Sequence, residues 1–461
     1  MLRDDARFRT STADVDARDD ETAKHNANDR SVVIVSPYFP PSTLAGVHRA
    51  RHLAKHLSQA GWTPIVLCVG ESYYEERLDP TLSTLVPGNV EIVKVGALPA
   101  WLTRCVGIGE LSLRAWRPLK RGLFRLLDRR SVGAVLITGS PYYPMLLAPE
   151  IKRRFGVPVV LDFQDPWVSA WGATQNLFSK AGVAHRLAAM LEPRALRAAD
   201  FVTSVSDTQN AEMAARYSWL DAERMQGVPI GGDPDDFVAL GSDHGSQLGD
   251  ALEPGLVHLS YVGTFLPKSG ALVRALFRSF ARLRSQDPAL AARIRLHFIG
   301  TSNQPNDHAS FRLRQIAEEE GITEAVHEIP QRLPFFQALN WLSRSNGVLL
   351  IGSDEPHYTA SKIYPALMCG RPFLSLFHRA SSAHAILSAA GGGCALAFTT
   401  HDDLSSLEPQ LAEALRTLAL SPEILGTADP AAYAPYEARA IAKRFAGIFD
   451  RLAAERAGRP R

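Results

Sequence analysis

The sequence predicts an α/β protein that contains two doubly wound parallel sheets. Short β-branched runs alternate with helical patterns from Ser31 onward, and this alternation predicts strand–helix–strand units. A polar, glycine-rich stretch around residues 227–255 interrupts the alternation, which then begins again. The chain has 461 residues, of which 46% are hydrophobic, and two domains of about 200 residues fit this length better than three small ones.

The elements of the first half follow from their local patterns. Residues 31–36 read SVVIVS, a run typical of a strand that is covered on both faces. The breaker-rich loop PYFPPSTLAG follows, then a helical pattern that ends at Gly61, and then the strand PIVLCV. Further strands are expected at 90–95, 133–138, 157–162 and 200–205. We therefore expect a first Rossmann-like domain over residues 31–235.

The second half carries a strand series of its own. Strands are expected at 256–263, 294–300, near 328, 347–352, 373–377 and 394–398. The amphipathic pattern at 436–455 predicts a long final helix. We expect a second Rossmann-like domain over residues 250–432. Because open parallel sheets bind ligands at the carboxyl ends of their strands, two such sheets that face one another predict an interdomain cleft.

Charge and cysteine content limit the function classes. Fifty Lys and Arg residues nearly balance 48 Asp and Glu residues, so the chain has no overall attraction for nucleic acid. An anionic ligand must then be held by a local cluster of cations. The four cysteines, Cys68, Cys105, Cys369 and Cys394, fit neither a zinc-binding spacing nor a disulfide framework. Unpaired thiols in a reducing cytoplasm are the expected state.

The first 30 residues differ from the rest of the chain. Residues 1–30 alternate charges of both signs and lack the apolar core of a signal peptide, which predicts a disordered extension. Elsewhere no apolar run approaches the ~18–20 residues that cross a bilayer. We expect a cytoplasmic protein.

The loop after the opening strand is the first candidate anion site. Gly46 at the start of the following helix lets a substrate approach the backbone, and the helix start offers free N–H groups. Arg49 in the first turn opposes the helix dipole, which is locally unfavourable. Contact with an anionic ligand explains this placement, and a surface ion pair explains it as well.

Two loops in the second half have the same character. In the segment YVGTFLPKSG, the backbone N–H groups of Gly263 and Thr264 could be exposed to a phosphate. Lys268 in the same segment could supply a positive charge. In DEPHYTASKIYPALMCGRP we expect Ser361 to be the N-cap of a short helix and Lys362 to lie in its first turn. For the loop with Lys268, a turn with a solvated lysine is the other interpretation. A diphosphate bound in the cleft explains all three loops together.

The motifs, taken in order, resemble a glycosyltransferase of the GT-B fold, close to the retaining family 4 type. The resemblance rests mainly on SPYFPP…GVHR, DFQDPW and SKIYPALMCGRP, and it covers about residues 31–455. It implies a nucleoside-diphosphate sugar as donor, no cofactor and no metal. It also implies that the helix 436–455 crosses back to complete the first domain.

The resemblance implies roles for particular residues. Lys268 and Lys362 would meet the pyrophosphate, Pro330 would lie near the base, and Gly46 and Arg49 would approach the donor from the first domain. Fixed cations stabilise a departing nucleoside diphosphate without a metal. The acidic cluster Asp233, Asp235 and Asp236 lies in the interdomain segment and not at a strand end, so we predict no metal site there.

The sequence also departs from the family pattern. His357 and Pro365 stand where the family has two glutamates, and Ser140 stands in the loop where a histidine is usual. The catalytic residues are therefore unknown, with Asp165 and Ser140 as weak candidates. Asp165 either orients an acceptor hydroxyl or holds the DPW turn.

Residues 101–130 form a possible membrane-binding segment. They contain eight Arg and Lys residues against Glu110 and Asp128, with aromatic and leucine residues between them. Such a stretch suits an anionic membrane surface and a lipid-linked acceptor on the inner face of the plasma membrane. A helix pair packed on the sheet, with solvated charges, is the other interpretation.

The leading hypothesis is a glycosyltransferase that moves a hexose-type sugar to a glycan, lipid-linked or small acceptor. Its setting would be the biosynthesis of a cell-surface polysaccharide or glycoconjugate, in the cytoplasm or peripheral on the membrane. The retaining outcome follows from the resemblance alone. A GT-B epimerase or phosphorylase is the rival among enzymes. A catalytically degenerate GT-B subunit that binds a nucleotide or serves as a scaffold is the rival among non-enzymes.

Overall fold

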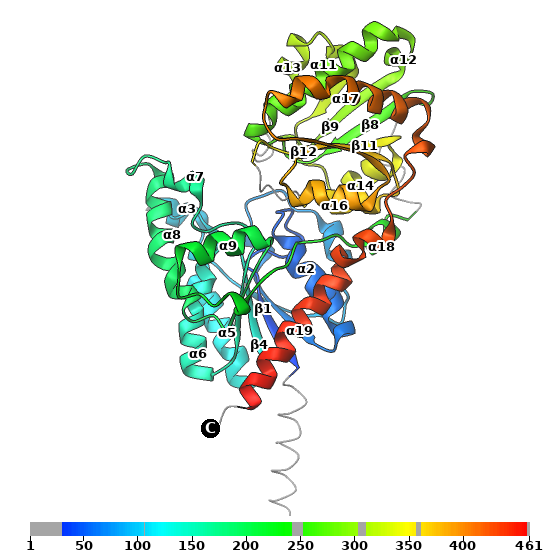
Figure 1. Cartoon of the computed structure of the whole chain (residues 1–461). Coiled ribbons are helices and arrows are strands. Elements are labelled where there is room, and N and C mark those ends of the chain that lie inside the picture. The colour runs from blue at the N-terminus through cyan, green and yellow to red at the C-terminus, as the bar shows by residue number, and fades with distance from the viewer. Residues whose placement is uncertain (1–29, 106, 242–251, 303–309, 356–360, 459–461) are drawn as a thin grey trace, which may run out of the picture.

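The computed structural model describes residues 30–105, 107–241, 252–302, 310–355 and 361–458. The predicted extension 1–30 lies outside this part of the chain except for its last residue, and His357 lies outside it as well. Figure 1 shows two α/β layers, one above the other, with the last helix running down across the lower one.

The first sheet has seven parallel strands in the order β3-β2-β1-β4-β5-β6-β7. Their bounds are β1 Ser31–Val35, β2 Thr63–Val69, β3 Glu91–Val95, β4 Ala134–Gly139, β5 Val159–Phe163, β6 Phe201–Ser204 and β7 Met225–Gly227. Strand β1 pairs with both β2 and β4, so the strand order reverses there. Such a reversal opens a crevice for ligands at the carboxyl ends of the strands.

The second sheet has six parallel strands in the order β10-β9-β8-β11-β12-β13. Their bounds are β8 Val257–Val262, β9 Ile294–Ile299, β10 Val326–Ile329, β11 Gly347–Ile351, β12 Phe373–His378 and β13 Gly393–Phe398. The order reverses between β8 and β11, which pair with one another. Two doubly wound sheets are confirmed.

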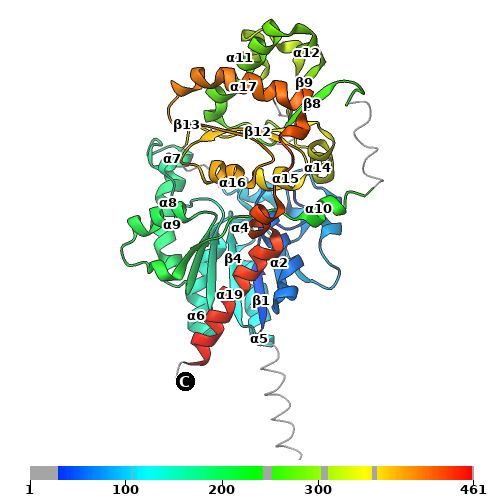
Figure 2. The same cartoon turned by 45° about the vertical axis from the view of Figure 1, so that its right-hand side comes forward.

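Helices cover both faces of each sheet (Figures 1 and 2). Around the first sheet lie α2 Val47–His56, α3 Ala100–Arg104, α4 Leu111–Arg114, α5 Trp116–Arg129, α6 Ala148–Phe155, α7 Ala170–Ala173, α8 Lys180–Leu196 and α9 Asp207–Arg216. Around the second lie α11 Gly270–Gln286, α12 Pro288–Arg293, α13 Arg314–Glu319, α14 Phe335–Arg344, α15 Ile363–Met368, α16 Ser382–Ala390 and α17 Asp403–Leu420.

The continuous apolar runs of the strands follow from this double covering. Successive side chains of a strand point to opposite faces of the sheet. In β1, Val33 and Val35 join one core cluster, whereas Val32 and Ile34 join another on the opposite face. Both faces of β1 are buried, so apolar side chains fill both positions of the alternation from Val32 to Val35.

Two stretches of chain connect the domains and lie side by side. The first contains α10 Pro234–Val238, and the second runs through α18 Pro430–Tyr433 into α19 Ala438–Ala457. Gly232 N donates to Tyr436 O at 3.1 Å, and Ala438 N donates to Gly232 O at 2.7 Å. Helix α19 then packs on the first domain, where Phe445 and Phe449 are fully buried.

Candidate active site

A cavity of about 250 Å³ lies between the two domains. Its walls on the first domain come from the loop after β1, from α2 and from the segment that contains α10. Its walls on the second domain come from the loops after β8, β9 and β10 and from the start of α15. The polar or charged lining residues are Thr43, His48, Arg51, His52, Asp233, Asp236, Thr264, Arg332, Ser361 and Lys362.

A smaller chamber of about 120 Å³ adjoins this cavity. It is lined by Ala45, Gly46, Gln164, Asp165 and Val205 from the loops of the first domain, by Ile230, and by Ser361 and Tyr364 from the second domain. Ala45, Ile230 and Ser361 line both spaces, so the two chambers belong to one cleft.

Lys362 is one of the cations that line the larger cavity. Its Nζ donates to the Tyr261 hydroxyl and lies 4.1 Å from the centroid of the Tyr261 ring. Burial lowers the pKa of Lys362 to about 7. Within the described residues no carboxylate pairs with this ammonium group. An incoming anion would therefore be its first charged partner.

Gly263 leaves the space that the Lys362 side chain occupies. Its φ is +143°, in the region that favours glycine, and an added Cβ would lie 3.3 Å from Lys362 Cδ. Thr264 follows on the cavity wall. Ser361 also faces the cleft, but the N-cap of α15 is Lys362, so the predicted capping role of Ser361 is wrong.

Lys268 does not join Lys362. Its side chain is 56% exposed, and its Nζ lies 3.1 Å from Glu355 Oε1. It is not among the residues that line either chamber. The expectation that both lysines face one ligand is therefore not met in this structure, because Glu355 already neutralises Lys268. Pro330 likewise stays behind the cavity wall, where its carbonyl accepts from Ser302 N.

Arg49 is structural, which corrects its predicted contact with the donor. It is fully buried, and its Nε lies 3.1 Å from Asp162 Oδ2. Its two Nη atoms donate to the carbonyls of Val228 and Pro229. Each nitrogen of the guanidinium group bonds within the protein and the side chain is fully buried, so it is closed to a ligand in this structure. The other explanation, a surface ion pair, correctly predicts an ion pair, but the pair is buried and not on the surface.

Sequence reasoning missed Arg332 and His48. Arg332 Nη1 donates to Thr43 O at 2.6 Å and so reaches from the second domain to the first. The His48 ring lies 5.0 Å from the Phe335 ring, again across the cleft. Burial, and then the charge of Arg51, lower the pKa of His48 to about 3. The position of His48 beside the glycine loop was a usable sequence indication, whereas that of Arg332 was not.

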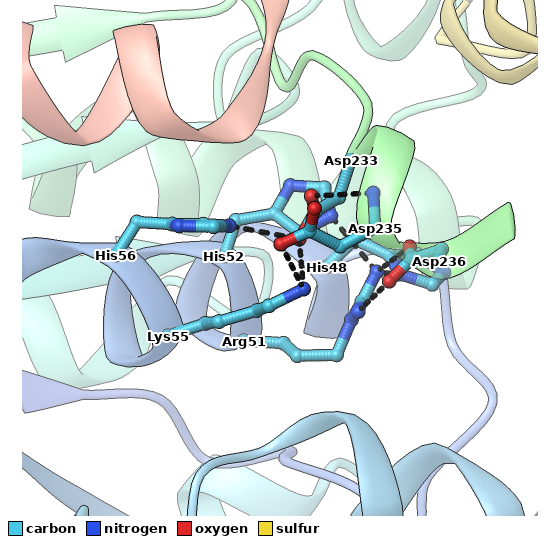
Figure 3. Close-up of polar contacts among 8 residues, drawn as sticks. All are labelled: His48, Arg51, His52, Lys55, His56, Asp233, Asp235 and Asp236. Atoms are coloured by element: carbon cyan, nitrogen blue, oxygen red, sulfur yellow. Dashed lines mark hydrogen bonds and ion pairs between the residues drawn. The ribbon is translucent and has the colours of Figure 1, made fainter. Parts of the chain in front are cut away.

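Helix α2 carries further basic residues that face three aspartates of the interdomain segment (Figure 3). Arg51 makes a two-bond ion pair with Asp236, at 2.7 and 2.6 Å. Lys55 and His56 each lie 2.8 Å from Asp233 Oδ2. Burial alone would raise the pKa of Asp233, but the bonds from His56 and Lys55 hold it well below its usual value.

This cluster offers a possible set of metal ligands, but a lysine already fills it. The ligand atoms of His56, Asp233 and Asp235 all lie within 4.8 Å of one another. Lys55 Nζ lies 2.8 Å from Asp233 and 3.1 Å from Asp235, where it supplies the positive charge that a metal would bring. The cluster therefore fits a structural tie between α2 and α10.

Comparison with known proteins agrees with this geometry. Residues 45–231 match the family model of the glycosyl transferase 4-like domain. The match covers less than half of the chain. No curated protein matches the sequence.

Solved structures extend the comparison to both domains and show the GT-B fold. Sucrose-phosphate synthase from Thermosynechococcus elongatus is 14% identical with a TM-score of 0.58, and the match covers 92% of this chain and 99% of that one. HepE from Anabaena, in complex with UDP-glucose, is 15% identical with a TM-score of 0.56, over 93% and 100%. Trehalose 6-phosphate synthase from Burkholderia multivorans is 14% identical with a TM-score of 0.58, over 94% and 99%.

The two weak catalytic candidates of this GT-B chain lie beside the Gly46 loop. Asp165 lines the smaller chamber, and its backbone carbonyl accepts from the Tyr142 hydroxyl at 2.9 Å. A Cβ added to Gly46 would lie 3.3 Å from the Ser140 carbonyl oxygen. Both residues are exposed, and their roles stay predictions. Pro365 lines the larger cavity, where a glutamate of the family pattern would have supplied a carboxylate.

The basic segment 101–130 divides into two parts in this GT-B chain. In α5, Leu119, Leu123 and Phe124 belong to the core of the first domain, so its apolar face is already covered. In α3, Trp101 is 74% exposed. Among the described residues, no helix combines the length and the hydropathy of a membrane span.

Proposed function

We propose that the chain is a glycosyltransferase that transfers a sugar from a nucleoside-diphosphate sugar to an acceptor hydroxyl. The observation that carries the proposal is Lys362, a half-buried lysine in the interdomain cleft with no carboxylate partner among the described residues. A pyrophosphate is the anion that such a cleft would take. The structure of HepE with UDP-glucose, which has the same fold, supports a donor of this class.

The residues around Lys362 suit the departure of a nucleoside diphosphate. Positive charge fixed beside the leaving oxygen stabilises the charge that develops as the glycosidic bond breaks. Lys362 would supply that charge, and Gly263 and Thr264 would let the phosphates approach the backbone. Arg332 also lines the cavity and is a second cation within the same space. The retaining outcome and the absence of a metal are part of this proposal.

The proposal is tested by nucleotide binding to two lysine variants. We expect one of UDP, GDP, ADP or dTDP, or a sugar conjugate of it, to raise the melting temperature of the wild-type chain. Lys362→Ala should lose this stabilisation. Lys268→Ala is the matched control and should keep it, because Lys268 is exposed and bound to Glu355. Stabilisation that survives in Lys362→Ala, or is absent from the wild type with every nucleotide, would overturn the proposal.

A binding protein without catalysis is the second candidate. Pro365 on the cavity wall, in place of a carboxylate, favours it. A time course of nucleoside diphosphate release from the bound donor, with glycan extracts as acceptors, separates the two functions. Binding without any release would favour the scaffold.

We further propose that the acceptor is lipid-linked and that the chain meets an anionic membrane through α7 and α8, in addition to Trp101. The exposed apolar side chains of this α7–α8 surface are Trp171, Leu177, Phe178, Val183, Leu187 and Met190. The last three recur at helical spacing and share one face of α8.

The charges of the α7–α8 surface point to an anionic occupant. Lys180 and Arg186 are exposed beside the apolar residues, and Arg186 lies 5.9 Å from the Phe178 ring. No acidic residue occurs in 166–191. Apolar and basic side chains without acidic ones are the composition that settles on anionic lipid. The segment begins directly after Asp165, so a membrane held there would lie near the smaller chamber.

A further inference from the structure

Two residues that line the smaller chamber, one from each domain, each have a buried polar atom with no partner among the described residues. These atoms are Gln164 Oε1 and the Tyr364 hydroxyl. Gln164 is 5% exposed and Tyr364 is 1% exposed, and both residues line the chamber. An unsatisfied polar group in a protein interior costs stability, so such groups are rare without a reason.

The orientation of the Gln164 amide follows from its neighbour. Its Nε2 donates to the carbonyl oxygen of Gly46 at 3.1 Å. Because a carbonyl accepts and cannot donate, the amide nitrogen must be the atom on that side. Oε1 is therefore the free end, an acceptor that needs a donor.

Tyr364 approaches from the opposite side of the cleft. It lies in the first turn of α15, two residues after Lys362, and its ring stacks on Tyr436 with centroids 5.6 Å apart. The stacking fixes the ring, and the hydroxyl has no partner among the described residues. Such a hydroxyl both donates and accepts.

We propose that Gln164 and Tyr364 form a hydroxyl-binding subsite for a sugar, filled from the cleft beside the pyrophosphate position. A sugar hydroxyl would donate to Gln164 Oε1, and another would pair with the Tyr364 hydroxyl. Asp165 at the chamber wall adds a third acceptor. The inference rests on the proposed function and names a further binding site within it.

Sugar hydroxyls reach this chamber from either of two sources. The transferred sugar of the donor lies next to its pyrophosphate, and the smaller chamber adjoins the cavity that holds Lys362. The acceptor sugar must reach the same bond from the other side. The chemistry that the subsite recognises is the same in both cases, and the experiment separates them.

The decisive variant is Tyr364→Phe, which removes one oxygen atom that has no partner in the part of the chain that the structure describes. If the hydroxyl had a structural role, its loss would lower the melting temperature. We expect the melting temperature to stay unchanged or rise, since an unsatisfied buried group disappears. We expect affinity for the sugar to fall about three- to tenfold, as for the loss of one hydrogen bond.

The experiment compares the affinities of the wild type and Tyr364→Phe for three kinds of ligand. The first is the nucleoside diphosphate that binds, and the second is its sugar conjugates. The third is methyl α-glucoside or methyl α-mannoside, measured with the diphosphate present. Weaker binding of a conjugate, with unchanged binding of the diphosphate alone, assigns the subsite to the donor sugar. Weaker binding of a glycoside assigns it to the acceptor. Gln164→Met should reproduce the pattern, because it keeps the length of the side chain and removes both polar atoms.

Two failures are distinguishable. If the diphosphate binds both proteins and neither sugar series weakens in Tyr364→Phe, the subsite is wrong while the proposed function stands. If no diphosphate binds the wild type, the proposed function fails and the subsite fails with it.

Discussion

Arg49 and Asp162 form a fully buried ion pair, with 3.1 Å between Arg49 Nε and Asp162 Oδ2. Asp162 also accepts from the Thr203 hydroxyl at 2.8 Å, and Arg49 binds the carbonyls of Val228 and Pro229. One side chain on α2 thus ties β5 to the segment that leaves the first domain.

Arg49→Leu should destabilise the chain by about 3–5 kcal/mol, because it leaves the Asp162 carboxylate buried without a counter-charge. Urea denaturation, followed by circular dichroism, measures the loss. Arg117→Leu on the exposed face of α5 is the control and should change the free energy of unfolding by less than about 0.5 kcal/mol. Equal effects of the two substitutions would contradict a structural role for Arg49.

Donor binding should weaken as the pH rises above 7. Burial holds the pKa of Lys362 at about 7 in the free protein, and a bound pyrophosphate would raise it. Binding of a nucleoside-diphosphate sugar then takes up a proton above pH 7. The association constant should fall about tenfold per pH unit from pH 7 towards the pKa of the complex. Titration calorimetry between pH 6 and 9, in buffers of different ionisation enthalpy, detects both effects.

Lys362→Arg is the control for this pH dependence. An arginine stays protonated over the whole range, so the affinity of that variant should be nearly constant with pH. A slope that persists in Lys362→Arg would assign the titration to another group.

Acid should destabilise the second domain through His297. Burial, and then the neighbouring His258, lower the pKa of His297 from 6.5 to about 3. Below about pH 6.5, His297 is therefore protonated in the unfolded chain but still neutral in the folded chain. The free energy of unfolding then decreases as the pH falls below 6.5. The loss from pH 7 to pH 5 should be about 2 kcal/mol for this group.

His297→Gln tests that assignment, since its free energy of unfolding should change by about 2 kcal/mol less than that of the wild type between pH 7 and pH 5. The assignment to His297 is wrong if His297→Gln keeps the wild-type pH dependence.

The α7–α8 surface should bind vesicles that contain phosphatidylglycerol and not vesicles of phosphatidylcholine alone. Phe178→Ser with Leu187→Ser should abolish flotation with the anionic vesicles and leave the melting temperature unchanged, because both side chains are exposed. Higher salt should weaken the binding of the wild type. If the double variant floats as well as the wild type at low salt, the membrane does not lie on this surface.

Much of the fold could be predicted from the sequence because its determinants are local. Strand β1 and the helix end at Gly61 are each predicted from a few neighbouring residues. Lys362 lines the cleft as expected, since its place depends on one loop and one short helix.

Positions that depend on distant partners were out of reach. Arg49 was predicted at the ligand because its partners, Val228 and Pro229, lie about 180 residues away in the chain. Lys268 does not line the cavity as predicted, because it forms an ion pair with Glu355 on another loop. Gln164 and Tyr364 lie within the motifs DFQDPW and SKIYPALMCGRP, but neither motif shows that the two residues meet, because they come together only where the two domains face one another.

The paired connections between the domains restrict how the molecule can open. Gly232 hydrogen-bonds to Tyr436 and Ala438, so the outgoing and returning chain act together as one hinge. Rotation of one domain about an axis through these connections would part the contact of Arg332 with Thr43, which joins the two domains across the cleft. The cleft would then open by a turn of a whole domain, and the largest displacements would lie farthest from Gly232.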